Sequence, residues 1–336
     1  MTVGKLGHEL LEKLLKTYVN DFNDSRVVVG PGIGEDAAVI DIGEKYLVAK
    51  TDPITFATEH IGFYAVNINV NDIVCTGAKP MWFQSTILLP EKLTTIELVD
   101  SIFKDIHDTC EKLDIAVVGG HTEIVADLQR PIIIGSLLGE VDKNSLVSTS
   151  GAKPGDALVL TKGIFIEGTS IIGREKQAFL KKKGYDSKFI EKCKNYLYNP
   201  GISVAREALL ANENFAISAM HDPTEGGLAC GIAEMALASN TGVEVELNAI
   251  KVLPEPEELS KIFDLDPKNT ISSGSLLIAI KSDLSDDLIE FLAKNGIESA
   301  KIGKIVPKNK GITIKSQQGI ITPLRYSEKD DIMKIF

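Results

Sequence analysis

The sequence predicts a two-domain protein of the α+β class, and two observations support this. A chain of 336 residues is long for one hydrophobic core, so two domains of roughly 150 residues each are expected. Helical and strand patterns also mix in both halves, and short turns join several strand-like runs as in antiparallel hairpins. We place the boundary in the polar, glycine-containing segment 148–156, which gives domains 1–150 and 151–336.

The first half begins with an amphipathic helix over 4–19, because its leucines and Val19 fall on one helical face. Strand-like runs at 37–41 and 46–50 follow, and Thr51-Asp52-Pro53 is expected to form a loop at the end of the second run. The remaining predicted elements are helices at 61–76 and 94–113 and strands at 83–89, 115–118 and 132–138.

The second half opens with a strand at 157–161 and a glycine-bearing segment at 162–169. Polar turn residues separate its other predicted elements, which are helices at 188–197, 202–212, 228–238 and 284–294 and strands at 216–220, 243–247, 276–280 and 312–314. The basic clusters at 181–183 and 301–310 are interpreted as solvated surface.

Composition excludes several classes of protein. A net charge of −11 argues against a nucleic-acid surface, which needs a clustered basic footprint. The four cysteines are widely spaced, which gives neither a zinc-ribbon spacing nor a disulfide framework and favours a reducing compartment. No apolar run is long enough for a membrane span, and no signal peptide is recognisable, so we expect a cytoplasmic protein.

The predicted helix at 61–76 has an unusual composition. It contains Asn67, Asn69, Asn71 and Asp72, whose side chains compete for backbone hydrogen bonds and disfavour helices. A purely structural helix would seldom contain four such residues in six positions. We interpret Asn71 and Asp72 as residues kept for chemistry, with a metal ion held against phosphate as the most natural use.

Acidic residues recur at the ends of other predicted elements. Asp36, Asp52 and Asp72 lie in three separate segments, and Asp222 lies in a fourth, within Asp-Pro-Thr-Glu-Gly-Gly. An isolated carboxylate at such a place is usually a turn or cap residue. Several together favour Mg²⁺, which prefers oxygen ligands and is shared between carboxylates and substrate phosphates.

Two pairs of glycines have a complementary role. Gly119-Gly120 is expected to form a turn after a strand, and Gly226-Gly227 opens a predicted helix. Backbone N–H groups at such places bind anions without interference from a Cβ atom. No Walker-type motif is present, and Gly30–Gly34 is only superficially similar to a dinucleotide fingerprint, so any ATP site must use another architecture.

Three other side chains have two interpretations each. His121 and His221 adjoin carboxylate-bearing segments, so each is either an acid/base or phosphate-contacting group or a turn histidine bonded to backbone. Lys50 precedes Thr51-Asp52 and is either a phosphate contact or a solvated residue at a strand end.

Six motifs together resemble a known family. They are Gly-Ile-Gly-Glu-Asp-Ala-Ala-Val (32–39), Lys-Thr-Asp (50–52), Asn-Asp-Ile-Val-Cys-Thr-Gly-Ala-Lys-Pro (71–80), Gly-Gly-His-Thr (119–122), Ser-Gly-Ala-Lys-Pro-Gly-Asp (150–156) and Asp-Pro-Thr-Glu-Gly-Gly-Leu (222–228). Their order is similar to that in the aminoimidazole ribonucleotide (AIR) synthase superfamily. The Gly-Gly-His-Thr and Asp-Pro-Thr-x-Gly-Gly-Leu motifs most resemble its HypE branch of hydrogenase maturation proteins.

The resemblance implies an N-terminal α/β domain whose sheet forms a barrel with that of a second subunit, and a C-terminal α+β domain. It implies an enzyme that uses ATP and Mg²⁺ to activate an amide or acid oxygen by phosphorylation. The implied metal ligands are Asp36, Asp52 and Asp72. The implied ATP contacts are Lys50, Asn71, Gly119, Gly120, Thr122, Gly226 and Gly227, and the implied catalytic residues are His121 and Asp222.

One departure from the HypE pattern concerns the acceptor. HypE ends in a cysteine that carries the reacting carboxamide, whereas residues 329–336 here contain no cysteine. We therefore expect either a small-molecule acceptor or one carried by a maturation partner protein. Two alternatives remain open: a small-molecule kinase of the thiamine-monophosphate kinase type, and a nucleotide-binding assembly protein without turnover.

Overall fold

The computed structural model describes residues 6–19, 24–32, 34–55, 57, 59–327 and 329–336. It divides into two compact units. The N-terminal unit consists of residues 26–30 and 36–146, and the C-terminal unit consists of residues 147–336 together with the described residues up to 25 and those in 31–35. Both units combine helices with a mixed sheet, so the predicted α+β class is confirmed.

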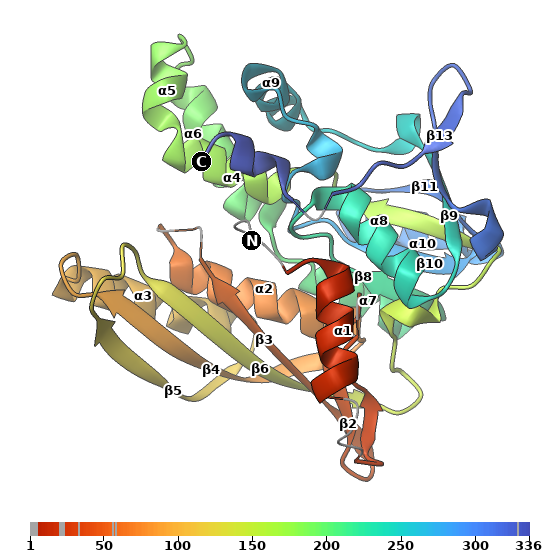
Figure 1. The fold of residues 1–336 in the computed structure, drawn as a ribbon, viewed down its shortest axis with the longest axis horizontal. Helices are drawn as coiled ribbons and strands as arrows, with labels where there is room; N and C mark the ends of the chain where they lie inside the picture. Colours follow the sequence, from red (N-terminus) through yellow and green to blue (C-terminus); the bar gives the residue numbers. More distant parts are fainter. Residues whose placement is uncertain (1–5, 20–23, 33, 56, 58, 328) are drawn as a thin grey trace. The chain divides into compact units, whose positions relative to one another are not determined.

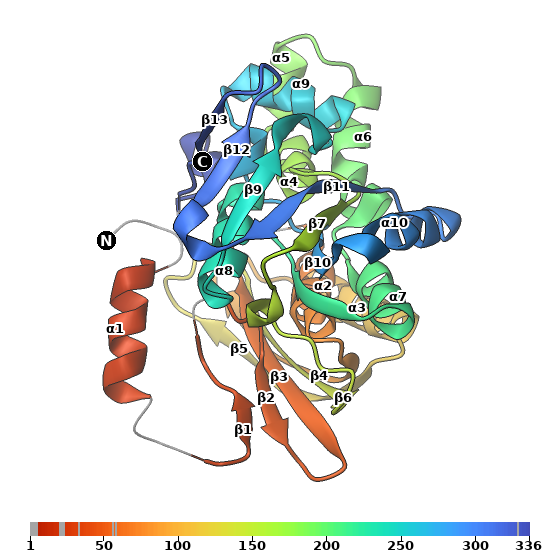
Figure 2. The same ribbon diagram turned by 90° about the vertical axis from the view of Figure 1, so that its right-hand side faces the viewer.

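The N-terminal unit is built on a six-stranded sheet in the order β1-β2-β3-β6-β4-β5. Strands β2 to β6 are labelled in Figure 1, and β1 is labelled in Figure 2. Its strands are β1 (Val27–Val29), β2 (Ala38–Asp41), β3 (Lys45–Ile54), β4 (Lys79–Pro90), β5 (Ala116–Val125) and β6 (Ile132–Asp142). All neighbours are antiparallel except β4 and β5, which are parallel because a helix connects them. Strand β5 is last in the strand order, so it forms one edge of the sheet.

Two helices, α2 (Ile61–Cys75) and α3 (Ile96–Lys112), pack against this sheet and each other. Helix α2 contacts β3, β6 and β4, and almost all of its residues are buried. It ends one residue before the predicted end, and Gly77 follows in the left-handed region two residues after Cys75. Thr95 caps α3 by accepting a hydrogen bond from the N–H of Leu98 at 3.2 Å.

Two predictions about this unit are wrong. Thr51-Asp52-Pro53 is not a loop, because β3 continues to Ile54 and stays in register with β6. A proline is tolerated there because the pairing of β2 with β3 stops at Ala49, which leaves one side of the strand open. Gly119-Gly120 is not a turn, because pairing with β4 carries β5 through both glycines to Val125.

The C-terminal unit contains a seven-stranded sheet in the order β13-β12-β9-β11-β7-β10-β8, part of which is seen side by side in Figure 2. The strands are β7 (Asp156–Thr161), β8 (Ile217–His221), β9 (Gly242–Glu246), β10 (Leu277–Lys281), β11 (Ser299–Val306), β12 (Ile312–Lys315) and β13 (Ile321–Pro323). The helices of this unit are α1 (His8–Tyr18), α4 (Ile166–Glu175), α5 (Gln177–Lys182), α6 (Ser187–Asn195), α7 (Ala205–Asn214), α8 (Gly227–Ala238), α9 (Pro254–Phe263) and α10 (Ser285–Lys294).

Two hydrophobic cores hold this unit together. The larger core joins α8 to strands β7, β9, β10 and β11, and the smaller one joins α4, α5, α6 and α9. Ile332, near the end of the chain, belongs to the smaller core, so the last residues are part of the packed structure. None of the helices in the described part of the chain combines the length and apolar character needed to span a membrane.

Candidate functional site

A charged cluster lies between β3 and α2 in the N-terminal unit. The ammonium nitrogen of Lys50 is 3.4 Å from Oδ2 of Asp52 and 3.3 Å from Oδ2 of Asp72. The Asp72 side chain is 7% exposed, that of Lys50 19% and that of Asp52 34%. The structure thus brings together three of the residues that the sequence singled out, and Lys50 supplies the positive charge between the two carboxylates.

Asn69 holds β3 in place beside this cluster. Its side-chain oxygen accepts a hydrogen bond from the N–H of Asp52 at 3.0 Å, and its amide donates to the carbonyl of Ala65 at 2.8 Å. A Cβ atom on Gly135, opposite Asp52 in β6, would lie 2.3 Å from the Asn69 amide nitrogen. Asn69 is therefore a buried clamp that fixes the backbone of Asp52.

The polar composition of α2 thus has two sources. Asn67 and Asn69 serve the structure, since Asn67 also returns a hydrogen bond to its own helix, at the carbonyl of Phe63. Asp72 faces Lys50, and Asn71 is fully buried next to it. Asn67 and Asn69 are therefore structural, and only Asn71 and Asp72, in the second half of α2, remain candidates for a chemical role.

Asp36 lies near the C-terminal end of the same helix. One of its carboxylate oxygens is within 4.8 Å of Sγ of Cys75, the last residue of α2. Asp72 precedes Cys75 by three residues, so both lie on one face of the helix. The three predicted metal ligands, Asp36, Asp52 and Asp72, are therefore arranged around the second half of α2.

The residues of β5 lie apart from this cluster within the unit. Strands β6 and β4 separate β3 from β5, which corresponds to about 14 Å at the usual strand spacing. His121 and Glu123 form an exposed pair there, with 3.5 Å between Nε2 and Oε2. Gly120 is required by packing, since a Cβ atom would lie 2.3 Å from the carbonyl oxygen of Ser85, while Gly119 faces open space.

The glycines before α8 are already engaged within the C-terminal unit. The N–H of Gly226 donates to Oδ2 of Asp330 at 2.7 Å, and that of Gly227 donates to the carbonyl of Thr224 at 3.0 Å. The group at this helix start is the carboxylate of the protein's own Asp330. The predicted contact of both glycines with ATP stays a prediction.

Asp222 and His221 lie at the end of β8. His221 is the last residue of the strand and pairs through Nε2 with Oε2 of Glu234 in α8 at 3.0 Å, and both side chains are buried. This pairing favours the structural interpretation of His221, although its partner is a side chain and not backbone. Asp222 follows directly and is 2% exposed.

Two buried acids with raised pKa values were not singled out from the sequence. Glu167, in the second position of α4, is 6% exposed, and burial raises its pKa to about 8. Asp330, near the end of the chain, is 7% exposed, and burial raises its pKa to about 6. The only signal for Glu167 was its place in the glycine-bearing segment 162–169.

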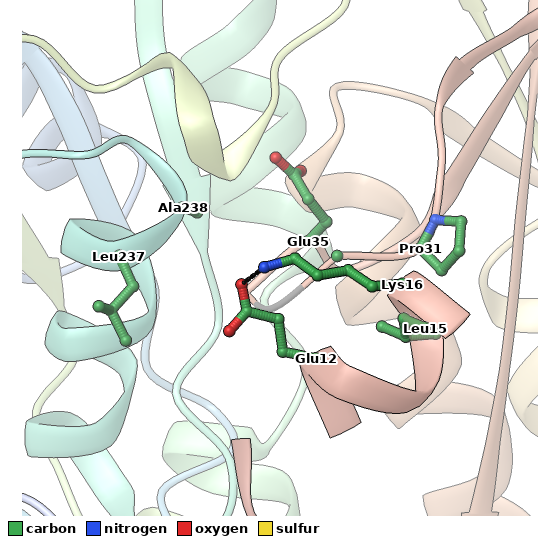
Figure 3. Close-up of a pocket in the computed structure, with 8 residues that line it drawn as sticks. Glu12, Leu15, Lys16, Pro31, Glu35, Leu237 and Ala238 are labelled. Atoms are coloured by element: carbon green, nitrogen blue, oxygen red, sulfur yellow. Dashed lines mark hydrogen bonds and ion pairs between the residues drawn. The ribbon is translucent and has the colours of Figure 1, made fainter. Parts of the chain in front are cut away.

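A pocket of about 450 Å³ lies elsewhere in the C-terminal unit, between α1, the residues Pro31, Gly32 and Glu35, and the end of α8 (Figure 3). Its charged groups are the ion pair of Glu12 with Lys16, at 2.5 Å, and Glu35. None of the predicted site residues lines it. Packing requires a glycine at position 34, next to the pocket residues in the chain, because a Cβ atom there would lie 2.7 Å from the carbonyl oxygen of Glu234.

Family models match most of the chain. Residues 34–141 match the model described as AIR synthase related protein, N-terminal domain, and residues 153–315 match its C-terminal domain. A protein of Methanocaldococcus jannaschii named as a hydrogenase expression/formation protein is 29% identical, covering 93% of this chain and 92% of that protein. Carbamoyl dehydratase HypE of Escherichia coli is 24% identical, covering 90% and 89%.

Solved structures share the fold. HypE in its complex with HypF has a TM-score of 0.74 and 21% identity, covering 96% of this chain and all of that one. HypE in complex with ATP has a TM-score of 0.72 and 20% identity, covering 98% of each chain. AaThiL in complex with AMPPCP and TMP has a TM-score of 0.73 and 18% identity, covering 97% and 99%.

Proposed function

The chain belongs to the AIR synthase related family, and from this premise we propose that it is a Mg²⁺-dependent enzyme that binds ATP and phosphorylates an amide or acid oxygen. Relatives of the same fold have been solved with ATP and with AMPPCP. The observation that carries the proposal is the cluster of Lys50, Asp52 and Asp72 on the buried helix α2.

The donor set fits Mg²⁺. Asp36, Asp52 and Asp72 offer hard carboxylate oxygens around one end of α2, and a positive charge already lies between two of them. Oδ2 of Asp72 lies 3.3 Å from the Lys50 ammonium nitrogen, so a cation is already accommodated beside this carboxylate. When bound, Mg²⁺ would neutralise phosphate charge and orient the terminal phosphate.

Lys50 has a defined part in this proposal. Its ammonium group balances the two carboxylates in the structure, and a metal ion at the same place would repel it. Lys50 would then turn its charge towards the ATP phosphates, for which ammonium groups are common partners. Asn69 would keep Asp52 in position throughout, because it bonds the backbone and not the carboxylate.

We propose hydrogenase maturation as the pathway, because a relative of this length is named as a hydrogenase expression/formation protein and another as carbamoyl dehydratase HypE. In the proposed reaction, the terminal phosphoryl group of ATP passes to the acceptor oxygen and ADP leaves. Loss of inorganic phosphate then removes that oxygen from an amide. His121 and Asp222 stay the proposed catalytic residues, and a partner protein comparable to HypF is proposed to supply the acceptor.

Release of ADP and phosphate, with and without candidate acceptors, tests the proposal. A HypE-like enzyme should release both in equal amounts when the acceptor is a protein-borne carboxamide, and Asp72→Asn should release neither. ADP release without free phosphate would instead indicate a small-molecule kinase. The fold shared with AaThiL, solved with TMP, makes this the second candidate. Tight ATP binding without any ADP would indicate an assembly protein.

We also propose a homodimer formed through β5. This strand pairs only with β4 among the described residues, and its side chains are exposed along nearly its whole length. Val117, Val118 and Ile124 are 52–61% exposed, so β5 is an apolar edge of the kind that pairs with another chain. Light scattering should give twice the chain mass, and Val118→Lys should halve it.

A further inference from the structure

The pocket beside α1 in the C-terminal unit has the size of a small-molecule site. Its volume of about 450 Å³ falls within the range of roughly 300–1,000 Å³ that is usual for ligand pockets. Helix α1, the residues Pro31, Gly32 and Glu35, and the end of α8 each supply one wall (Figure 3). The proposed function makes no use of this pocket, so its lining must indicate what it binds.

Two of the three walls are packed directly on each other. A Cβ atom on Gly34 would lie 2.7 Å from the carbonyl oxygen of Glu234 in α8 and 3.3 Å from the Cβ atom of Ala238. The N–H of Glu35 donates to the carbonyl of Gly32 at 3.4 Å, which holds these two lining residues together. The pocket is therefore preformed on this side, and a ligand need not order it.

Apolar side chains face each other across the pocket. Figure 3 shows Leu237 on one side and Leu15 with Pro31 on the other. Leu237 is 49% exposed, Pro31 is exposed and Leu15 is half-buried. A ligand with an apolar body would remove this surface from water, which is the main favourable term in the binding of most small molecules.

The charges of the lining select a cation. Lys16 is engaged with Glu12 at 2.5 Å, so Glu35 is the unbalanced charge among the described lining residues, and its carboxylate points away from that pair in Figure 3. The pocket also adjoins the C-terminal end of α8, whose last turn contains no basic residue. Such an end has a partial negative charge. Lys308 is bound to Asn240 beyond this end, at 2.7 Å, and is not one of the described lining residues.

We propose that this pocket binds an organic cation with an apolar body. The charged group pairs with Glu35 near the end of α8, and the body packs between Leu15 and Leu237. Such a ligand balances the Glu35 charge and covers the exposed apolar side chains at once. The site goes beyond the proposed function, because none of the residues assigned to ATP, Mg²⁺ or catalysis lines it.

Tryptamine is a suitable probe, with tryptophol as its neutral counterpart and indole-3-propionate as its anionic one. Titrations of the full chain, followed by NMR signals of the probe, measure the three affinities. A molecule of this size should bind with a Kd of roughly 1 mM. The wild type should bind tryptamine at least fivefold more tightly than tryptophol, and indole-3-propionate most weakly of the three.

Two variants test the assigned contacts. Glu35→Gln should weaken tryptamine binding about threefold and leave tryptophol binding unchanged, because it removes a charge and keeps the shape. Leu237→Lys should weaken the binding of both probes, and that of tryptamine more, because it replaces an apolar wall with a positive charge. Leu237 is half exposed, so this variant should fold. Glu213→Gln, on the exposed surface of α7 in the same unit, should bind both probes as the wild type does.

Equal affinity of the wild type for tryptamine and tryptophol would overturn the proposal, as would an equal loss of both probes in Glu35→Gln. Unchanged binding by Leu237→Lys would also overturn it, since the probe would then lie elsewhere. The same titrations with ATP and Mg²⁺ present should give the same affinity for tryptamine. Competition between ATP and tryptamine would contradict the proposal, because the pocket would then be part of the nucleotide site.

Discussion

Replacement of Asp72 by asparagine removes one negative charge from the Lys50 cluster and changes little else. Asparagine has nearly the shape of aspartate, and the position is 5% exposed, so the packing of α2 on the sheet is kept. The variant removes the ion pair of Lys50 with Asp72 and keeps the one with Asp52, at 3.4 Å. It therefore isolates the contribution of the Asp72 charge.

The expected effects on stability and on ligand binding differ in size. A buried charge that loses its only partner costs about 3–5 kcal/mol, but Lys50 keeps Asp52 and some exposure to solvent, so we expect about 1–2 kcal/mol. Loss of one of three Mg²⁺ ligands should weaken ATP binding in Mg²⁺ by at least about 100-fold, or roughly 2.7 kcal/mol. The variant should therefore lose more free energy of ATP binding than free energy of unfolding.

Titration calorimetry of ATP in excess Mg²⁺ and urea denaturation measure the two effects on the same sample. Asp41→Asn is the matched control, because Asp41 lies on the same sheet and pairs with Lys143 at the surface. It should bind ATP as the wild type does. A folded Asp72→Asn variant with wild-type affinity for ATP would refute the assignment of Asp72 as a ligand, and an unfolded one would make the residue structural.

Three further predictions concern stability in urea. Gly120→Ala should cost about 2–4 kcal/mol, because its Cβ would meet the Ser85 carbonyl, whereas Gly119→Ala in open space should cost less than about 1 kcal/mol. Between pH 4.5 and about 8, Glu167 is protonated in the folded protein and ionised in the unfolded chain. The free energy of unfolding should therefore fall as pH rises through this range, by up to about 1.4 kcal/mol per pH unit. The variant Glu167→Gln should lack this slope. Asn69→Ala should cost about 2–4 kcal/mol, since it opens a cavity and leaves the N–H of Asp52 without its hydrogen-bond acceptor. An unchanged midpoint of urea denaturation would contradict the role of Asn69 in fixing β3.

Much of the fold could be predicted because local signals agree with the packing. Helices α2, α3 and α8 combine clear periodicity or apolar composition with defined ends, and their predicted ranges differ from the observed ones by one or two residues. The predicted strand at 157–161 likewise matches β7. The division into domains 1–150 and 151–336 stays a prediction.

Strand β11 was not predicted, because its lysines give the segment the charge pattern of a solvated surface. Lys301 and Lys304 were interpreted as part of a solvated cluster, yet Ile302 and Ile305 between and after them are fully buried. The strand lies between β9 and β7, with one face in the core and the lysines outside. A half-buried strand can therefore have the charge pattern of a surface loop.

The candidate site was predicted in its residue types but not in its contacts. The sequence singled out Lys50, Asp52 and Asp72, but it did not indicate that the lysine would pair with both aspartates. Glu167 and Asp330 were not singled out, because they are far apart in sequence and only the packing of the C-terminal unit buries them. Residue patterns report local structure, whereas such clusters depend on tertiary contacts.

Calorimetric titration of the wild-type protein with ATP, first with Mg²⁺ and then with EDTA, tests the central claim most directly. Binding through a cluster of aspartates needs a metal ion to bridge carboxylate and phosphate, since the two repel each other. We predict clear binding with Mg²⁺ and at least a 100-fold weaker affinity in EDTA. The absence of ATP binding in the presence of Mg²⁺ would contradict the proposed enzyme, the alternative kinase and the nucleotide-binding assembly protein together.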